Sequence, residues 1–319
     1  MRTLVTVGGS YAQPSAEELE DHLARCDEEG FWLDIEAPGK EDYELLERLF
    51  GYHPLTIEDI EQRNERPKLD EYPGYAFVVL FTAEWAGAEL VFREQHLYLS
   101  RNQLVSVHHE PAPALAELMH RIKAAPEATK GDPGFLQYLV IDQLVDSLFP
   151  ILERLDDMVD SLEEAISGPA RTDVMGAIYH LRHQVSTLRR YLGAQRDLFQ
   201  RLVSHSIEMQ KRETTLYYRD VYDHLVRQYE TVDSLRDLLT GAMDVYLSRV
   251  SNTLNSTVKQ LTAIASLFLP LTFLTGFFGM NFGFLVTNIG GPASFLGVLG
   301  LMLATVLVQL YIFTRRGWI

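Results

Sequence analysis

The chain has 319 residues, with 44 Asp and Glu side chains against 28 Lys and Arg. This strong acidity argues against a nucleic-acid partner and favours cations as ligands. The charge is unevenly distributed, because all the acidic residues and all but three of the basic ones lie in residues 1–258. The single cysteine, Cys26, excludes an internal disulfide.

Residues 1–130 are predicted to form an α/β domain, because short β-like runs alternate with helical patterns. The order of the strands is not readable from the sequence. His108 and His109 are adjacent, follow a strand-like run and have no cysteine neighbours, so we assign them no metal. The predicted strands lie at 4–7, 31–36 and 75–81, with two more between Glu89 and His109, and the predicted helices at 15–26, 40–50 and 112–124.

Residues 131–258 change in character to long amphipathic helices, which we interpret as an acidic helical hairpin and a stalk. A first helix is predicted over 139–166, and two more follow Gly168-Pro169, with a turn between 204 and 215. No proline occurs from 170 to 269, so the last helix could run unbroken from about Leu216 to Phe278. The acidic side chains of the predicted helix at 139–166 could concentrate cations, although a helix face that is simply exposed to solvent is the simpler explanation for them.

A stretch of 55 residues, from Gln260 to Thr314, contains no Asp, Glu, Lys, Arg or His. Since a bilayer core of about 30 Å needs roughly 20 apolar residues per helix, this stretch accommodates two spans. We predict a first transmembrane helix over 259–281, an extracytoplasmic loop over 282–294, a second transmembrane helix over 295–314 and a basic tail over 315–319. Because the flanking basic residues are Lys259, Arg315 and Arg316, both termini are expected to be cytoplasmic.

A polar stripe precedes and enters the first span. Its members share one helical face at spacings of three or four residues, and they change from polar to mainly apolar and small. Several copies packed around an axis would line a tube with a polar mouth and an apolar throat, whereas a coiled-coil seam explains the spacing equally well. Two spans are too few to enclose a pore, so the tube requires a cyclic oligomer. The stripe consists of Asp244, Ser248, Ser251, Asn255, Val258, Leu261 or Thr262, Ala265, Leu269, Thr272 and Gly276.

The first span ends in Gly279-Met280-Asn281, followed by Phe282 and preceded by Leu-Pro-Leu-Thr-Phe at 269–273. This segment resembles the Gly-Met-Asn signature of the CorA family of divalent-cation (magnesium/cobalt) transport proteins. The resemblance extends to segments 51–60, 66–68, 218–224 and 243–248 and to the basic-aromatic end at 315–318. Glycine and asparagine also suit a helix C-cap, so the motif can have a structural role as well.

The resemblance implies a divalent-cation channel, not an enzyme, for passive, membrane-potential-driven uptake of Mg²⁺ and also of Co²⁺ and Ni²⁺. Cytosolic Mg²⁺ bound between subunits would gate it, and no organic cofactor is implied. The chain would be an α+β membrane protein that assembles as a homopentamer among the lipids of the cell (inner) membrane. The resemblance assigns selectivity to Gly279, Met280 and Asn281, pore lining to Asp244, Asn255 and Thr272, a hydrophobic gate to Leu261 and Leu269, and a regulatory intersubunit metal site to Asp59 and Asp220 with Glu58 and Asp142.

Other interpretations remain open. The loop at 282–292 has no acid, where many family members place acids, and Phe278 replaces the tyrosine that commonly precedes the motif. A Zn²⁺ transporter of the same superfamily is one alternative, although the intact Met280 favours magnesium. A membrane-anchored receptor or enzyme with non-conducting spans is another, but no nucleophile, base and orienting residue stand out together. For Glu58 and Asp59, exposed acids in the first turn of a helix would be a purely structural explanation.

Overall fold

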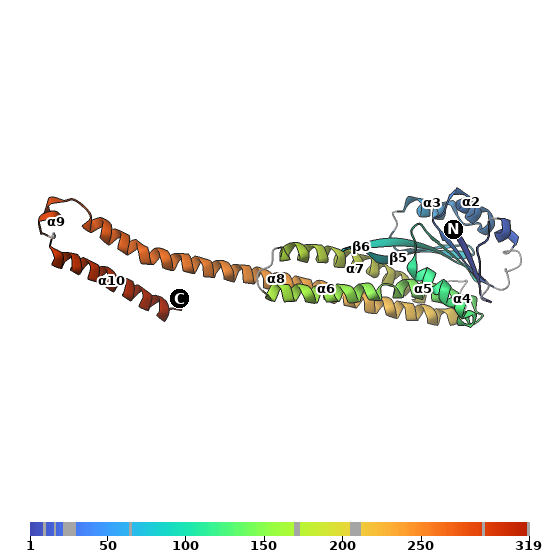
Figure 1. The fold of residues 1–319 in the computed structure, drawn as a ribbon. Helices are drawn as coiled ribbons and strands as arrows, with labels where there is room; N and C mark the ends of the chain where they lie inside the picture. The colour runs from blue at the N-terminus through green and yellow to red at the C-terminus, as the bar shows by residue number, and fades with distance from the viewer. Residues whose placement is uncertain are drawn as a thin grey trace. The chain divides into compact units, whose positions relative to one another are not determined.

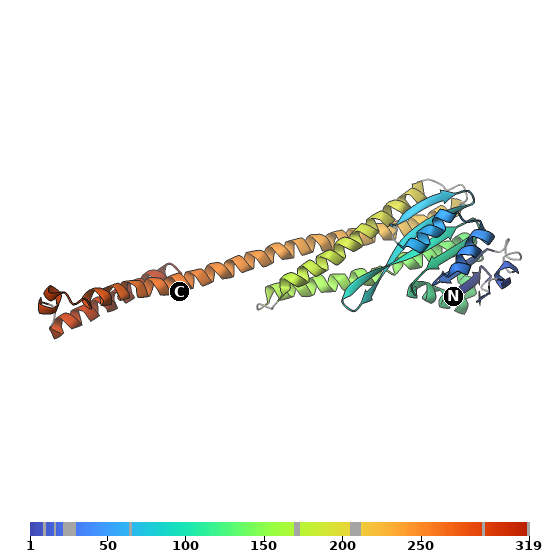
Figure 2. The same cartoon turned by 90° about the horizontal axis from the view of Figure 1, so that it is seen from above.

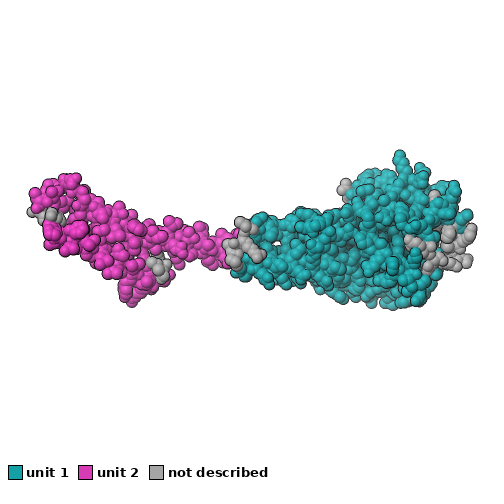
Figure 3. All heavy atoms as spheres, in the orientation of Figure 1, with its two compact units in different colours: residues 1–242 teal, residues 243–319 magenta. Residues whose placement is uncertain are grey.

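The computed structural model describes residues 1–8, 11–15, 17–21, 30–63, 66–168, 173–204, 212–288 and 291–317. Two compact units divide the chain, Met1–Ala242 and Met243–Ile319, called unit 1 and unit 2 below (Figure 3). Helix α8 (Arg212–Phe278) contributes to both units. Cys26 and Trp318 lie outside the described residues, and the domain boundaries expected from the sequence stay a prediction.

Unit 1 contains a seven-stranded mixed sheet with the order β2-β1-β3-β7-β6-β5-β4. β3 and β7 are parallel, whereas the other neighbouring pairs in this order are antiparallel. These two central strands are buried on both faces, which explains their nearly continuous apolar sequences. The strands are β1 (Arg2–Thr6), β2 (Tyr11–Ala12), β3 (Phe31–Glu36), β4 (Lys68–Tyr72), β5 (Tyr75–Ala86), β6 (Glu89–Leu99) and β7 (Gln103–His108).

Helices cover both faces of this sheet (Figures 1 and 2). α2 (Lys40–Phe50) and α3 (Pro54–Gln62) lie on one face, where Leu46 and Ile57 join a core cluster with Leu33 of β3. α4 (Pro113–Ala124) and α5 (Pro133–Asp146) lie on the other face, and α5 contacts β3 and β7. The α/β character expected for residues 1–130 is therefore confirmed.

The helix predicted over 139–166 is wrong as a single element. α5 ends at Asp146, and α6 (Phe149–Ser167) begins after Ser147 and Leu148. Pro150 lies in the first turn of α6, where its missing N–H costs no helical hydrogen bond, and its ring opposes continuation of α5. After a short 3₁₀ turn η1 (Pro126–Thr129), the helical part of unit 1 thus consists of α5, α6, α7 (Val174–Ser204) and the first half of α8.

The long last helix is confirmed, because α8 runs from Arg212 to Phe278 even though it contains Pro270. A proline cannot donate to the carbonyl four residues earlier, which here belongs to Ser266. That carbonyl oxygen instead accepts a hydrogen bond of 2.9 Å from Nε2 of Gln309 on α10 (Pro292–Arg315). A side chain of the neighbouring helix thus replaces the bond that the proline removes. The short helix α9 (Gly283–Asn288) lies within the expected loop.

Within the described part of the chain, three helical segments are long and apolar enough to cross a membrane: Pro133–Ser167, Thr215–Phe278 and Pro292–Arg315. In the first segment, 56% of the most apolar window is buried inside the protein, so its apolar side chains belong to the core of unit 1. The windows of the other two are 6% and 0% buried. Apolar helices that the protein itself leaves uncovered are typical of membrane spans, in agreement with the two spans expected from the sequence.

The Gln309 contact generates a prediction. Replacing Gln309 by Met keeps the volume but leaves the Ser266 carbonyl without its donor, so we expect a loss of stability of about 1 kcal/mol. In a Pro270→Ala background the backbone donates to Ser266 itself, and the same substitution should cost much less. Thermal unfolding of the four proteins in detergent measures this coupling. Equal losses in both backgrounds would show that Gln309 acts by packing alone.

Candidate functional site

The Gly-Met-Asn motif directly follows the last residue of α8, Phe278. The N–H of Gly279 donates to the carbonyl oxygen of Thr275 at 2.9 Å, and the N–H of Met280 donates to that of Phe277 at 3.3 Å. A Cβ atom on Gly279 would lie only 2.8 Å from the Thr275 oxygen, so this position needs glycine. Asn281 follows directly and is exposed. The motif therefore closes the helix and presents an amide side chain beyond it.

A cavity of about 290 Å³ lies beside the motif within unit 2. Asn281 and Ser294 provide the polar side chains of its described lining, which contains no charged residue. A cation at this end of the helix would thus meet neutral oxygen atoms, which suit a hydrated ion better than carboxylates that strip its water. The lining residues are Phe278, Met280, Asn281, Leu285, Val286, Ser294, Phe295 and Val298.

The stripe expected to line a tube lies on the face of α8 that points away from α10. Ala263 of α8 and Phe313 of α10 are both buried, which marks the face that α10 contacts. The stripe is roughly half a helical turn away from Ala263. Leu261 and Leu269 on the stripe are 63% and 74% exposed. This face is therefore available to other protein chains.

A group of ionisable side chains joins α5 to α8 in unit 1. Nδ1 of His224 lies 2.7 Å from Oδ1 of Asp146 and 3.5 Å from Oδ1 of Asp142. One ligand atom from each of the three residues fits within 4.8 Å of the others, so together they could hold a metal ion. Two carboxylates and one imidazole are a mixed oxygen and nitrogen donor set, which suits Zn²⁺, Co²⁺ or Ni²⁺ as well as Mg²⁺.

Tyr138 links this group to Asp220. Its hydroxyl donates a hydrogen bond of 2.8 Å to Oδ2 of Asp220, so α5 holds the carboxylate of α8 in place. Burial, and then the repulsion of Asp146, raise the pKa of Asp142 to about 6, although the neighbouring His224 opposes the increase. Burial and hydrogen bonding to Asp220 also raise the pKa of the Tyr138 hydroxyl. A cation placed between these acids would relieve their mutual repulsion.

The structure places Glu58 and Asp59 on α3, apart from that group. α3 begins at Pro54, so both acids lie beyond its first turn. Oδ2 of Asp59 lies 2.7 Å from Nζ of Lys68 on β4, while the exposed Glu58 accepts a hydrogen bond of 2.6 Å from Gln62. Because α3 and α5 cover opposite faces of the sheet, the structure brings Asp142 and Asp220 together but does not bring Asp59 to them within one chain (Figure 1).

Four of these residues were not selected from the sequence: Tyr138, Asp146, His224 and Lys68. Helical spacing could have found three of them, since Tyr138 and Asp146 are each four residues from Asp142, and His224 is four residues from Asp220. Lys68 gave no such signal, because its contact with Asp59 depends on β4, a strand that the sequence did not predict.

Comparisons with known proteins show the family of the chain. The family described as "CorA-like Mg2+ transporter protein" matches residues 27–316 of the chain. The chain belongs to the CorA family. Among curated proteins, YfjQ of Bacillus subtilis is 35% identical over 288 residues, covering 90% of this chain and 89% of that protein. The "Cobalt/magnesium transport protein CorA" of Thermotoga maritima is 32% identical over 292 residues, covering 90% and 83%.

The fold agrees with that of a CorA protein along the whole chain. The complete structure of the CorA magnesium transporter from Methanocaldococcus jannaschii matches with a TM-score of 0.84. The match covers 100% of this chain and 99% of that chain at 23% sequence identity. The α/β domain, the long helix and the two apolar helices are thus the CorA arrangement, as expected from the resemblance.

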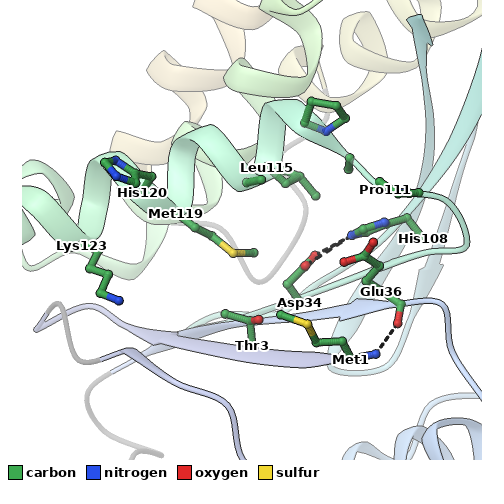
Figure 4. Close-up of a pocket in the computed structure, with 13 residues that line it drawn as sticks. Met1, Thr3, Asp34, Glu36, His108, Pro111, Leu115, Met119, His120 and Lys123 are labelled. Atoms are coloured by element: carbon green, nitrogen blue, oxygen red, sulfur yellow. Dashed lines mark hydrogen bonds and ion pairs between the residues drawn. The ribbon is translucent and has the colours of Figure 1, made fainter. Parts of the chain in front are cut away.

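A second cavity, of about 360 Å³, lies between the sheet and α4 (Figure 4). His108 lines it, with Nε2 3.2 Å from Oδ1 of Asp34 and Nδ1 donating to the carbonyl oxygen of Glu110 at 2.6 Å. Ser106 donates to the same Asp34 oxygen at 2.5 Å. Burial disfavours the imidazolium, but the hydrogen bonds and the charge of Asp34 outweigh it and raise the pKa of His108. His108 of β7 thus contacts both Asp34 of β3 and the loop that precedes α4.

The interaction of His108 with Asp34 makes the stability of the folded protein depend on pH. The pKa of His108 is raised above its ordinary 6.5. The contribution of the protonated imidazole to the free energy of unfolding is therefore complete below about pH 6.5 and is lost as the pH rises through the folded-state pKa. We expect His108→Gln to lower the melting temperature of the full chain in detergent more at about pH 5.5 than at about pH 8.5. His120→Gln, an exposed histidine in the same cavity, is the matched control. A difference independent of pH would contradict the assignment.

Proposed function

We propose that the chain forms a channel for the passive uptake of Mg²⁺, and also of Co²⁺ and Ni²⁺, across the cell (inner) membrane. The observation that carries this proposal is the exposed amide of Asn281 at the end of α8, in a segment of 55 residues without an ionisable side chain. Mg²⁺ dehydrates reluctantly, so a ring of neutral amide oxygens can select the hydrated ion. The membrane potential drives a divalent cation inward by about 4.6 kcal/mol per 100 mV.

The conducting unit is a homopentamer, with both termini in the cytoplasm. Asp244, Asn255 and Thr272 line the pore, and Leu261 and Leu269 form a hydrophobic gate. Their exposure on the face opposite α10 supports this arrangement, because five such faces can meet around one axis. Rings of leucine in a narrow tube resist wetting, so a small widening of the tube is enough to switch conduction.

Cytosolic Mg²⁺ regulates the channel at a site between subunits, formed by Asp59 and Glu58 of one chain and by Asp220 and Asp142 of its neighbour. The positions of α3 and α5 on opposite faces of the sheet support this site, since acids on these helices meet only when two chains associate. Without a cation the carboxylates repel each other, so Mg²⁺ holds the subunits together and favours the closed state.

Zinc transport is the second candidate. The observation that favours it is the imidazole of His224 beside Asp142 and Asp146, since nitrogen donors prefer zinc to magnesium. Met280 in the motif and the neutral cavity beside it favour magnesium. Ion flux separates the two candidates, and it also separates both from a membrane anchor that conducts nothing.

Asn281→Ala should reduce Mg²⁺ uptake into proteoliposomes by about tenfold or more, because the substitution removes the amide oxygens that contact the hydrated ion. Uptake of Mg²⁺ and Zn²⁺ is measured separately with a fluorescent indicator inside the vesicles. Asn288→Ala, which removes another amide from the same connection, is the matched control and should retain the flux. Flux of zinc alone would favour the zinc transporter, and flux of neither ion would favour the anchor.

Asp59→Ala and Asp220→Ala should each relieve inhibition by Mg²⁺ on the side of unit 1, because each removes one half of the bridging carboxylates. We expect the half-inhibitory Mg²⁺ concentration to rise about tenfold or more. Asp223→Ala, an exposed acid on the same turn of α8 as Asp220, is the control and should leave it unchanged. If Asp59→Ala and Asp223→Ala behave alike, the regulatory site lies elsewhere.

A further inference from the structure

We propose that Lys68 is a tethered counter-cation that competes with Mg²⁺ for Asp59 and so sets the concentration at which the regulatory site fills. This inference rests on the proposed regulatory role of Asp59. It adds a residue that is not one of the four acids of the proposed site. The ammonium group of Lys68 contacts Oδ2 of Asp59, one of the two carboxylate oxygens that a bridging ion could bind.

The contact is close and partly shielded from solvent. Nζ of Lys68 lies 2.7 Å from Oδ2 of Asp59, and the two side chains are only 22% and 23% exposed. A charge-assisted hydrogen bond of this length in a partly buried place is stronger than an ion pair in open water. Asp59 is therefore a carboxylate whose charge is already compensated.

The strand holds Lys68 in position. Lys68 begins β4, and its backbone is paired with Val79 of the long strand β5. Its Nζ also lies 5.7 Å from the centre of the Phe77 ring, within reach of a cation–π interaction. Because the sheet fixes the backbone of Lys68, its ammonium group stays close to Asp59 and has a high effective concentration there.

A second carboxylate, that of Asp70, can accept the ammonium group of Lys68 when Mg²⁺ displaces it from Asp59. Nζ of Lys68 lies 3.6 Å from Oδ2 of Asp70, which is two residues along β4 and thus on the same face of the strand. Asp70 is 44% exposed, so an ammonium group that leaves Asp59 moves toward a carboxylate in contact with water. Displacement of Lys68 from Asp59 therefore does not leave a buried ammonium group without a partner.

Competition of this kind lowers the apparent affinity for Mg²⁺ in proportion to the fraction of Asp59 that is paired with Lys68. Mg²⁺ displaces the ammonium group of Lys68 only because the ion carries two charges and at the same time binds Asp220 of a neighbouring chain. The lysine thus keeps the site open at low Mg²⁺ and raises the concentration needed to fill it. Without the lysine, the site would fill earlier and the channel would close at a lower cytosolic Mg²⁺.

Lys68→Met tests this, because it removes the charge but keeps the length of the side chain. We expect the half-inhibitory Mg²⁺ concentration in proteoliposomes to fall at least roughly two- to fivefold, which is the upper part of the range for solvent-exposed ion pairs. The Mg²⁺ concentration that gives half-maximal thermal stabilisation of the chain in detergent should fall by the same factor. Lys68→Arg retains the charge and should remain close to the wild type.

Arg63→Met is the matched control for a general change of the electrostatic field. Arg63 caps the same helix as Asp59, but its guanidinium contacts Glu110 and His109. A shift equal to that of Lys68→Met would overturn the competition. A second test is the double variant Lys68→Met with Asp59→Asn, in which the effect of Lys68→Met should vanish.

The outcomes keep the two proposals apart. If Asp59→Ala leaves inhibition by Mg²⁺ unchanged, the proposed regulatory site fails, and this inference fails with it. If Asp59→Ala relieves inhibition while Lys68→Met shifts neither midpoint, the regulatory site stands and only the competition by Lys68 is refuted. Flux in the absence of added cytosolic-side Mg²⁺ checks that each variant still assembles a conducting channel.

Discussion

The hydrogen bond from Gln309 to the Ser266 carbonyl shows the constraint on which the arrangement of unit 2 depends. In a bilayer, every backbone polar group needs a partner within the protein, since no water is available. Pro270 breaks one bond of α8, and α10 supplies the missing donor. The two apolar helices are thus joined by a polar contact as well as by packing, and the opposite face of α8 stays open.

This division of α8 into two faces organises the proposed channel. The face that carries Ala263 is used within the chain, whereas the face that carries Leu261 and Leu269 is exposed in it. In unit 1, the sheet makes a similar division, because its two faces carry the two sets of acids on different helices. In unit 1 the acids proposed to act together are therefore separated within one chain, whereas in unit 2 one chain supplies a single face of the proposed pore. Association of several chains would complete both sites.

Much of this was visible in the sequence. The stretch of 55 residues without an ionisable side chain predicted the two spans, because a bilayer core excludes charge. The absence of proline from 170 to 269 predicted the long helix. α2 and β3 begin and end where the sequence indicated. β4 was not predicted, because Lys-Leu-Asp-Glu-Tyr is short, charged and buries only Leu69. The contact between Lys68 and Asp59 depends on that strand and could not be inferred from spacing, whereas the contact of Tyr138 with Asp220 needed the packing of α5 on α8.

The crowding around Gly279 has a consequence for how this protein can diverge. Any larger side chain there would press on the Thr275 carbonyl, so the backbone at the end of α8, next to Asn281, would have to shift. The residues that end the helix and the residue that presents the amide are consecutive, so a substitution at position 279 would also affect the position of the amide. Selection for ion specificity at Asn281 would therefore also retain glycine at position 279.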